Sequence, residues 1–316
     1  PRRWAAESSP SDGRSGPRRG FRAPARAAAV ALAAAALLFG RPASADDTFV
    51  VDSFADQVDS DLVDIACQTA VGTCTLRAAV MQANVNPGHT TILLPPGVFD
   101  LTRLPSGPNA ADSGDLNLSK PSAQGVIRIR GESAAETIVD GGDLDRIFRV
   151  EPGASAHLED LTVRNGTADR GGGILAQGAL LLSGVRVVGN EASLDGGGLH
   201  IDTLSTVGMG FTDIVGNQSS GAGGGLFISG NSDGVVNFLY GAIRDNLSSA
   251  GGGIYHFGSA QLTLQRASVR GNEAPLGGGV ALVEPSSTVR IESSTIDGNR
   301  ATGGIGGGLL NYATLN

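Results

Sequence analysis

The sequence predicts an all-β fold, a right-handed parallel β-helix (solenoid) with a small N-terminal, disulfide-linked helical cap. The first observation is a glycine triplet that recurs six times within the 316 residues. The triplets begin at Gly171, Gly196, Gly223, Gly251, Gly277 and Gly306. Their spacings are 25, 27, 28, 26 and 29 residues. Self-similarity at such a period is typical of an array of stacked repeats.

The second observation is the strand pattern inside each repeat. Apolar residues stand ten, eight and three positions before a recurring asparagine, as Val236, Phe238 and Ile243 do before Asn246. Residues two apart face the same side of a strand, and the five-residue step leaves room for a corner. Three short strands per repeat, with no helical stretch, indicate one rung of a β-helix. Leucine-rich repeats could share the period, but their signature is absent.

The third observation is that asparagine itself, which stands a few residues before five of the triplets. Its positions are Asn190, Asn217, Asn246, Asn272 and Asn299. In parallel rungs about 4.8 Å apart, each side-chain amide can bond to the one above and the one below. The pattern therefore predicts an asparagine ladder with a structural role, rather than a catalytic or metal-binding one.

Residues 1–45 have the pattern of a signal peptide. A basic stretch that includes Arg18 and Arg19 precedes an apolar run from Ala27 to Phe39, and Ala43-Ser44-Ala45 forms an A-x-A cleavage site. The apolar run is too short to span a membrane. The arginine pair leaves open whether export uses the general secretory or the twin-arginine route.

The charge of the mature chain is strongly acidic. Residues 1–45 carry eight Arg and two acids, so 15 basic and 29 acidic residues remain, a net charge of −14. Nucleic acid is excluded as a partner, because its binding requires positive charge. We expect an exported protein, secreted or located at the bacterial cell surface.

Residues 46–104 form a different unit. A strand is predicted at 48–51, and a helix is predicted over Thr75–Asn84, with an Asn-Pro-Gly sequence beyond its end. Cys67 and Cys74 predict a disulfide, because paired cysteines in an exported protein are typically oxidised. The open end of a β-helix exposes unpaired strand edges, so a polar-faced helix over the first rung would close that end.

Four motifs in this unit occur in an order that resembles a known family. They are Phe49-Val50-Val51-Asp52, Cys74-Thr75-Leu76-Arg77-Ala78-Ala79, Ala83-Asn84 and Ile92-Leu93-Leu94-Pro95-Pro96-Gly97. With the cysteine pair they resemble the CSLREA domain, an export-associated bacterial module, in which Ser and Glu replace Thr75 and Ala78. The triplet repeats resemble those that follow such domains and those of polymorphic outer-membrane proteins. The resemblance implies a secreted or surface β-helix, without an agreed activity.

Residues 105–316 are assigned to the β-helix, with early rungs at 126–150. The sequence stops at Asn316, part-way into a rung. We therefore expect the β-helix to be incomplete at its C-terminus.

Two hypotheses about function are compatible with this fold. The first is a non-catalytic structural or adhesive protein with a face that binds a polysaccharide or a cell-surface protein. The second is a carbohydrate-active enzyme, a polysaccharide lyase, hydrolase or epimerase, which would need clustered carboxylates on adjacent rungs. The best acidic cluster, Asp140, Asp143 and Asp145, lies in a turn and is interpreted as a solvated corner. The four histidines lack metal-ligand spacing, so no metal or cofactor is expected and the first hypothesis is favoured.

A possible binding face follows the triplets. The residues two positions after the last glycine are Leu175, His200, Phe227, Tyr255, Ala281 and Leu310. Parallel stacking would align them in one semi-apolar stripe, called the stripe below. An exposed apolar patch usually marks an interaction site, so one interpretation is a platform for a glycan or a protein. The other, of equal weight, is that a loop or a further C-terminal part covers the stripe.

Overall fold

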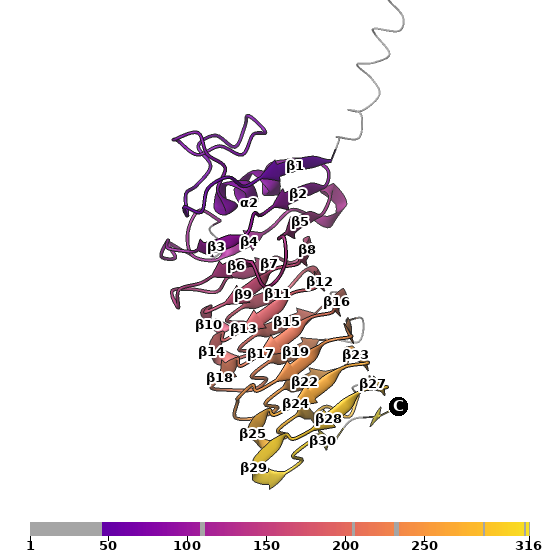
Figure 1. Cartoon of the computed structure of the whole chain (residues 1–316). Coiled ribbons are helices and arrows are strands. Elements are labelled where there is room, and N and C mark those ends of the chain that lie inside the picture. Colours follow the sequence, from indigo (N-terminus) through magenta and orange to yellow (C-terminus); the bar gives the residue numbers. More distant parts are fainter. Residues whose placement is uncertain are drawn as a thin grey trace, which may run out of the picture. The chain divides into compact units, whose positions relative to one another are not determined.

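A computed structural model describes residues 46–107, 111–203, 206–230, 234–286, 288–312 and 314–315. All of them fall within one compact unit. The predicted signal peptide, 1–45, lies outside the described residues. The unit is a parallel β-helix of about seven turns, which confirms the predicted fold class (Figure 1).

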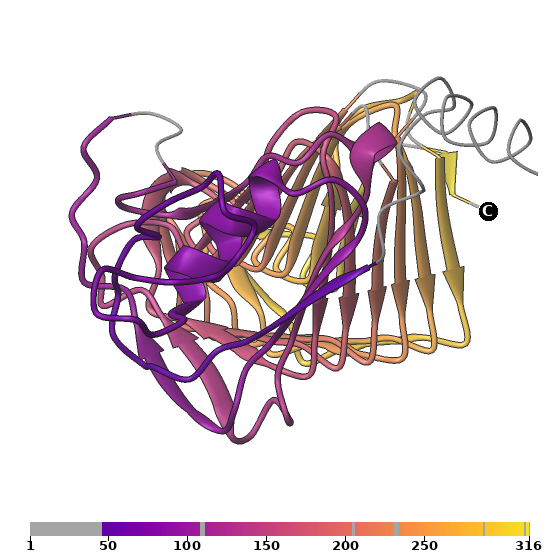
Figure 2. The ribbon, with the colours of Figure 1, turned by 90° about the horizontal axis from the view of Figure 1, so that it is seen from above.

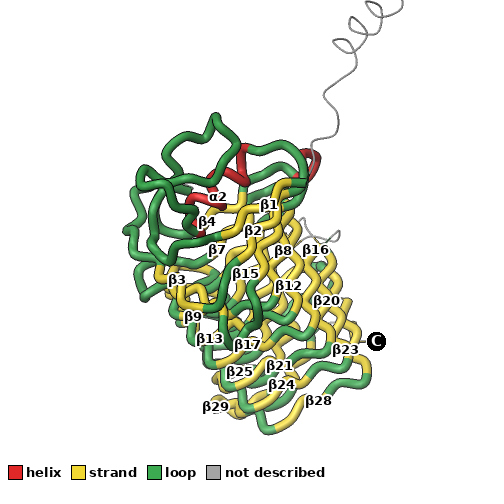
Figure 3. The backbone as a smooth tube through the Cα atoms, turned by 45° about the horizontal axis from the view of Figure 1, so that its top comes forward, coloured by secondary structure: helices red, strands yellow, loops and turns green. Residues whose placement is uncertain are grey.

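From Ser155 onward a turn runs through sheet 1, sheet 2, the segment that forms the short sheet 3, the glycine triplet and then sheet 4. In the described residues, the earlier turns lack the strand of sheet 3 and the triplet. Every paired strand is parallel to its partner (Figure 3). Sheet 1 contains β1 (Asp47–Val50), β2 (Thr90–Leu93), β5 (Ile127–Arg130), β8 (Ser155–Glu159), β12 (Ala179–Ser183), β16 (Thr206–Gly210), β20 (Val235–Leu239), β23 (Gln261–Gln265), β27 (Thr288–Glu292) and β31 (Thr314–Leu315). Sheet 2 contains β3 (Gly97–Asp100), β6 (Thr137–Asp140), β9 (Thr162–Arg164), β13 (Arg186–Val188), β17 (Asp213–Val215), β21 (Ala242–Arg244), β24 (Ser268–Arg270) and β28 (Thr295–Asp297).

Sheets 3 and 4 complete the turn. Sheet 3 consists of β10 (Thr167–Arg170), β14 (Glu191–Asp195) and β18 (Gln218–Ser219), and of the pair β25 (Glu273–Leu276) and β29 (Arg300–Ile305). Sheet 4 contains β4 (Leu116–Leu118), β7 (Phe148–Val150), β11 (Ile174–Ala176), β15 (Leu199–Thr203), β19 (Leu226–Gly230), β22 (Ile254–Gly258), β26 (Val280–Leu282) and β30 (Leu309–Asn311). The sequence predicted three strands per rung and missed sheet 3, whose short strands are largely polar and lack the apolar pairs that reveal the others.

The core lies inside the turns, where equivalent apolar residues stack on one another. Val207, Val236 and Leu262 are paired in register along sheet 1, and all three are buried. Phe238 and Ile243, at the other two positions of the repeat pattern, are completely buried. Burial of such side chains contributes roughly 25 cal/mol per Å² of apolar surface, so this continuous column is a principal source of stability.

The glycine triplets form the corner between sheets 3 and 4. Gly223 has a φ of +67°, a left-handed conformation that favours glycine. A Cβ at Gly224 would lie 2.4 Å from the carbonyl oxygen of Leu247 in the next rung. No side chain fits at that distance, so the spacing of the rungs at this corner requires glycine.

The five asparagines form one hydrogen-bonded row along the corner between sheets 2 and 3. The Nδ2 of Asn217 donates to the Oδ1 of Asn246 at 3.0 Å and to the Val187 carbonyl at 3.0 Å. Its Oδ1 accepts from the backbone N–H and the Nδ2 of Asn190, at 3.0 and 2.9 Å. The same bonds join the remaining members down to Asn299. The amides of Asn190, Asn217, Asn246 and Asn272 thus bond to the rungs on both sides of them.

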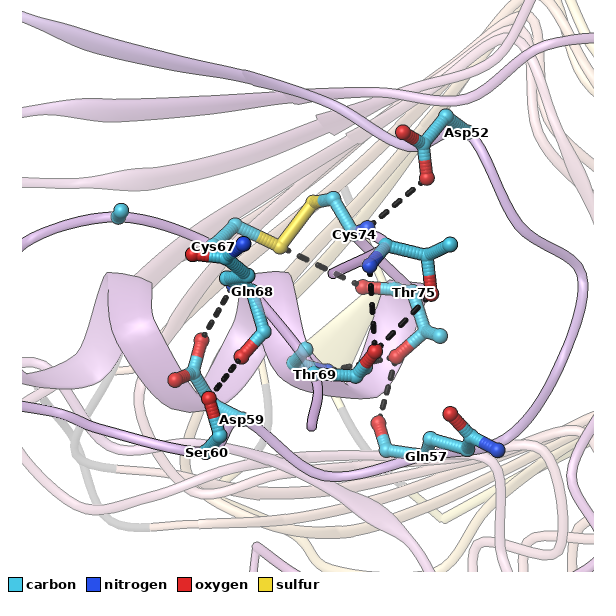
Figure 4. The surroundings of a disulfide bond; sticks show 12 residues. Asp52, Gln57, Asp59, Ser60, Cys67, Gln68, Thr69, Cys74 and Thr75 are labelled. Carbon is cyan, nitrogen blue, oxygen red and sulfur yellow. Dashed lines mark hydrogen bonds between the residues drawn. A yellow bond between two sulfur atoms is a disulfide. The ribbon is translucent and has the colours of Figure 1, made fainter. Parts of the chain in front are cut away.

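The cap closes the end of the stack at β1, where the helix α2 (Leu76–Val85) lies across the first strands (Figure 2). A 3₁₀ helix, η1 (Ser122–Gln124), follows β4, and its Gln124 carbonyl accepts the N–H of Gly88, just beyond α2. The Thr75 hydroxyl caps α2 by accepting the Ala78 N–H at 3.1 Å. The predicted disulfide between Cys67 and Cys74 is confirmed, with a Cα–Cα distance of 5.2 Å (Figure 4).

Two polar residues of α2, Arg77 and Gln82, are themselves buried. Most of α2 is buried, because the segment 52–74 packs over its outer side. Arg77 is 0 % exposed, and its Nε and Nη2 bind the two carboxylate oxygens of Asp56 at 2.5 and 3.2 Å. Its remaining donors reach the carbonyls of Ala111 and Gly114. This fully bonded buried pair joins the helix to the segments on both sides.

Candidate functional site

The stripe is aligned as the repeat predicted. Leu175, His200, Phe227, Tyr255, Ala281 and Leu310 pair in register along sheet 4. The rings of His200 and Phe227 stack with centroids 4.7 Å apart, and those of Phe227 and Tyr255 with centroids 5.4 Å apart. Stacking of rings along the axis follows directly from the parallel register.

The stripe is not an open apolar platform, however. Leu175, His200 and Phe227 are only 8 %, 5 % and 9 % exposed, and Ala281 is fully buried. Tyr255 and Leu310 are partly exposed. Within the part of the chain that the structure describes, the stacked rings cover one another.

Burial also decides the charge of His200. Desolvation lowers its pKa to about 4, and the nearby carboxylate of Asp195 on β14 only partly opposes this. His256 points into the core from β22, and burial lowers its pKa to about 4 as well. Both rings are therefore neutral at physiological pH, and neither histidine serves as a cationic binding group.

The stripe belongs to one column of residues on sheet 4. Toward the cap, the residues of this column are polar. Arg149 on β7 pairs with Leu175, and Asn117 on β4 pairs with Arg149. At this end there is a cleft of about 450 Å³. It is lined by Pro105, Ser106, Gly107, Asp115, Asp145, Arg146 and Arg149. Its volume lies within the usual range of small-molecule sites.

Arg146 forms the floor of this cleft and joins three rungs. Its Nη1 binds the Oδ2 of Asp115 at 2.8 Å, and its Nη2 binds the Oδ1 of Asp169 at 3.2 Å. Its Nε donates to the carbonyls of Arg170 and Gly171. The guanidinium is 7 % exposed and fully bonded, so it fixes the carboxylates around it.

The acidic groups of the cleft differ in their surroundings. Desolvation raises the pKa of Asp115, although the Arg146 guanidinium opposes that rise. Asp145 is half-buried, and its Oδ2 accepts the Asp115 N–H at 3.0 Å. The interpretation of the cluster at 140–145 as a solvated corner applies to Asp143, which is exposed. It was wrong for Asp145, which lines the cleft, and for Asp140, which pairs with Arg164 at 2.6 Å.

The partners of Arg149 leave one side of it facing the cleft. Its Nε lies 3.0 Å from the Oε1 of Glu151, and its Nη2 donates to the Oε1 of Gln177 at 3.1 Å. Asn117 is 1 % exposed and donates to the Oδ1 of Asp115 at 3.0 Å. Its own Oδ1 is a buried acceptor with no hydrogen-bond partner among the described residues. Such atoms are rare in folded proteins and call for an explanation.

Sequence reasoning missed this cleft, although a signal existed. Ile174, which follows a triplet, pairs with Phe148, and Phe148 pairs with Leu116. The positions of the triplet glycines are therefore taken by Asp145-Arg146-Ile147 in one rung and by Ser113-Gly114-Asp115 in the rung before it. Charged residues where the repeat otherwise has glycine mark the place where the corner opens into a cleft.

Metal binding has no support in the part of the chain that the structure describes. Within residues 46–107, 111–203 and the later described ranges, no group of three or more His, Cys, Asp or Glu could hold a metal ion. No helix in those residues is long and apolar enough to cross a membrane. Neither a protein-family model nor a curated protein sequence matches the chain. The function is therefore inferred from the site alone.

Proposed function

We propose that this chain is an exported, non-catalytic β-helix protein that binds a neutral saccharide at the cleft between Asp115 and Arg149. The observation that carries the proposal is the composition of the cleft, which lies at the polar end of one column of sheet 4. Its lining combines carboxylate and guanidinium groups with the ring of Pro105. Convergent polar groups beside a small apolar surface suit a sugar, which has a hydroxyl rim and apolar CH faces.

The charge of the site favours a neutral ligand. Arg146 is neutralised by Asp115 and Asp169, and Arg149 by Glu151. The mature chain carries a net charge of −14, so a polyanion would be repelled at long range. The carboxylate oxygens of the cleft accept hydrogen bonds from hydroxyl groups, and its guanidinium N–H groups donate to them.

Export is part of the proposal. The signal-like pattern of 1–45 and the resemblance of the cap to the CSLREA domain both support it. The disulfide between Cys67 and Cys74 is compatible with an oxidising compartment. A secreted or cell-surface location, with an adhesive role toward a polysaccharide, follows from these features taken together.

The test is a binding measurement with a matched variant. Protein spanning residues 46–316 is applied to an array of neutral hexasaccharides (β-glucans, α-glucans and chitin oligomers), and the affinity of the strongest binder is then measured by calorimetry. Arg149→Gln should weaken binding at least tenfold. Arg128→Gln is the control, since Arg128 pairs with Glu159 on sheet 1, away from the cleft. Equal affinity for wild type and Arg149→Gln would show that the cleft is not the binding site. Binding to a protein but to no saccharide would show that the ligand is not a saccharide.

One observation favours a second candidate, a carbohydrate-active enzyme. Asp115 is 7 % exposed, its pKa is raised by burial, and it lies beside a second carboxylate, Asp145. Two carboxyl groups on adjacent rungs are the usual pair for glycoside hydrolysis. Release of reducing ends from the array saccharides by wild type, and its loss in Asp115→Asn, would establish this candidate in place of a non-catalytic protein.

A further inference from the structure

The corner between sheets 1 and 2 carries a second column, on the outside of the molecule. Its members lie between the strand of sheet 1 and the strand of sheet 2 in successive rungs. They are Asp160, Gly184, Phe211, Tyr240, Arg266 and Ser293, with φ of 53°, 66°, 51°, 57°, 51° and 49°. The left-handed conformation is uncommon for bulky residues and costs about 1 kcal/mol or more at each. Two aromatic residues at such positions are not explained by packing of the core.

The two rings of this column form an exposed stack. Phe211 is 67 % exposed and Tyr240 is 43 % exposed. Their centroids are 5.2 Å apart, and the ring planes differ by 13°. The Arg266 guanidinium lies over the Tyr240 ring at 5.2 Å and donates to its hydroxyl at 2.8 Å. Arg266 therefore covers one end of the stack and holds the Tyr240 ring in place.

The other end of the stack is open, because the preceding rung has glycine at this position. The atoms nearest to where a Cβ of Gly184 would lie all belong to Asp160, whose Oδ1 is 2.5 Å from that point. Among the described residues, the Phe211 ring stacks on one aromatic ring, that of Tyr240. The column thus has a gap one rung thick, about 4.8 Å. An aromatic face bounds the gap on one side and a carboxylate bounds it on the other.

Sheet 1 has a hollow on its outer face, three residues before the column. Gly210, next to Phe211 in the chain, has no atom within 4 Å of where its Cβ would be. Two residues earlier, Gly208 pairs with Leu181 and helps to line a cavity of about 230 Å³. His157 and Leu181 also line this cavity, and Leu181 is 39 % exposed. The strands that lead to the gap therefore carry a hollowed, partly apolar surface.

We propose that this gap is a second saccharide subsite, which takes one pyranose ring of a neutral glycan. The sugar stacks its CH face on Phe211, and its hydroxyl groups donate to the Asp160 carboxylate. The neighbouring sugar unit occupies the hollow near Leu181. The proposal rests on the proposed function only for the class of ligand, since the gap and the cleft are formed by different sheets.

The dimensions and the chemistry of the gap select this occupant. A pyranose ring is about as thick as one rung, and it combines an apolar face with a polar rim. The Asp160 side chain is 45 % exposed, and its ion pair with Arg130 is a long one at 4.0 Å, so its oxygens remain accessible to a hydroxyl donor. A polyanion would meet this carboxylate directly and be repelled. A planar cation such as an arginine side chain is the competing occupant.

The experiment uses the protein of residues 46–316 with cellohexaose and chitohexaose as probes, in saturation-transfer NMR and calorimetry. Phe211→Ala removes the stacking face. Gly184→Asn fills the gap, and asparagine tolerates the left-handed conformation. Phe257→Ala is the matched control, because Phe257 is 50 % exposed on β22 and lies outside the column. We expect saturation transfer to the ring CH protons of one sugar unit, and its loss in the first two variants with unchanged signal in the control.

Three outcomes would overturn the subsite. The first is unchanged saturation transfer in both Phe211→Ala and Gly184→Asn. The second is binding of an arginine-containing tripeptide, but of neither sugar, that Phe211→Ala abolishes. The third is no binding of either sugar at millimolar concentration. Loss of sugar binding in Arg149→Gln, with full binding in Phe211→Ala, would overturn the subsite and leave the proposed function standing.

Discussion

The cap and the repeat region are stabilised by different kinds of contact. In the cap each contact occurs once, as the Arg77–Asp56 pair and the Cys67–Cys74 disulfide do. In the repeat region the same contact recurs from rung to rung, as the asparagine row does. A unique contact has no neighbour that can replace it, whereas a repeated contact is shared with the rungs on both sides. The two regions should therefore respond differently to single substitutions.

The largest expected effect is on the buried ion pair of the cap. Arg77→Met would leave Asp56 buried and unpaired, so the free energy of unfolding should fall by about 4 kcal/mol. Urea denaturation of residues 46–316 measures it. Arg128→Met is the matched control, because the Arg128 side chain in its pair with Glu159 is 47 % exposed and should contribute less than about 1 kcal/mol. A loss at Arg77 as small as that of the control would show that the cap does not depend on its unique contacts.

The next largest effect is the loss of stability of the repeat region in acid. Burial lowers the pKa of His256 to about 4, below its ordinary value of 6.5, so the unfolded chain binds this proton more tightly than the folded one. The contribution of the neutral His256 ring to the free energy of unfolding is fully present above pH 6.5 and is lost as the pH falls toward 4. The shift corresponds to about 3 kcal/mol.

His256→Leu should remove that part of the acid sensitivity, since Ile228 and Leu282 are its neighbours in the column. The measurement is urea denaturation at pH 7 and pH 4. His89→Gln serves as the control, because His89 is exposed. The interpretation fails if the difference in stability between the two pH values is the same in wild type and His256→Leu.

The smallest effect compares two positions of the asparagine row. Asn217→Ala would leave the N–H and Nδ2 donors of Asn190 without an acceptor and should cost about 2 kcal/mol. Asn299→Ala removes a member that is only partly buried, where water can replace it, and should cost about 1 kcal/mol. Thermal unfolding of both variants measures the difference. Equal losses would mean that burial does not control the contribution of a row member.

The difference between repeated and unique contacts also explains how much of the molecule could be predicted from the sequence. The register of sheet 4, which aligns Leu175, His200 and Phe227, follows from the spacing of the triplets because parallel rungs place equivalent residues side by side. Their exposure does not follow from it. The sequence did not reveal sheet 3, and the spacing does not show that the His200 and Phe227 rings are buried against one another.

The sequence by itself determined the β-helix, the rung length, the position of the cap helix and the cysteine pair, because each depends on local or periodic patterns. Only the tertiary structure decided that Asp115, Asp145, Arg146 and Arg149 share one cleft, and that Gly184 leaves a gap beside Phe211. These arrangements join residues one or two rungs apart whose types break the repeat. Their distances depend on how the rungs pack against one another, and no periodicity in the sequence records that packing.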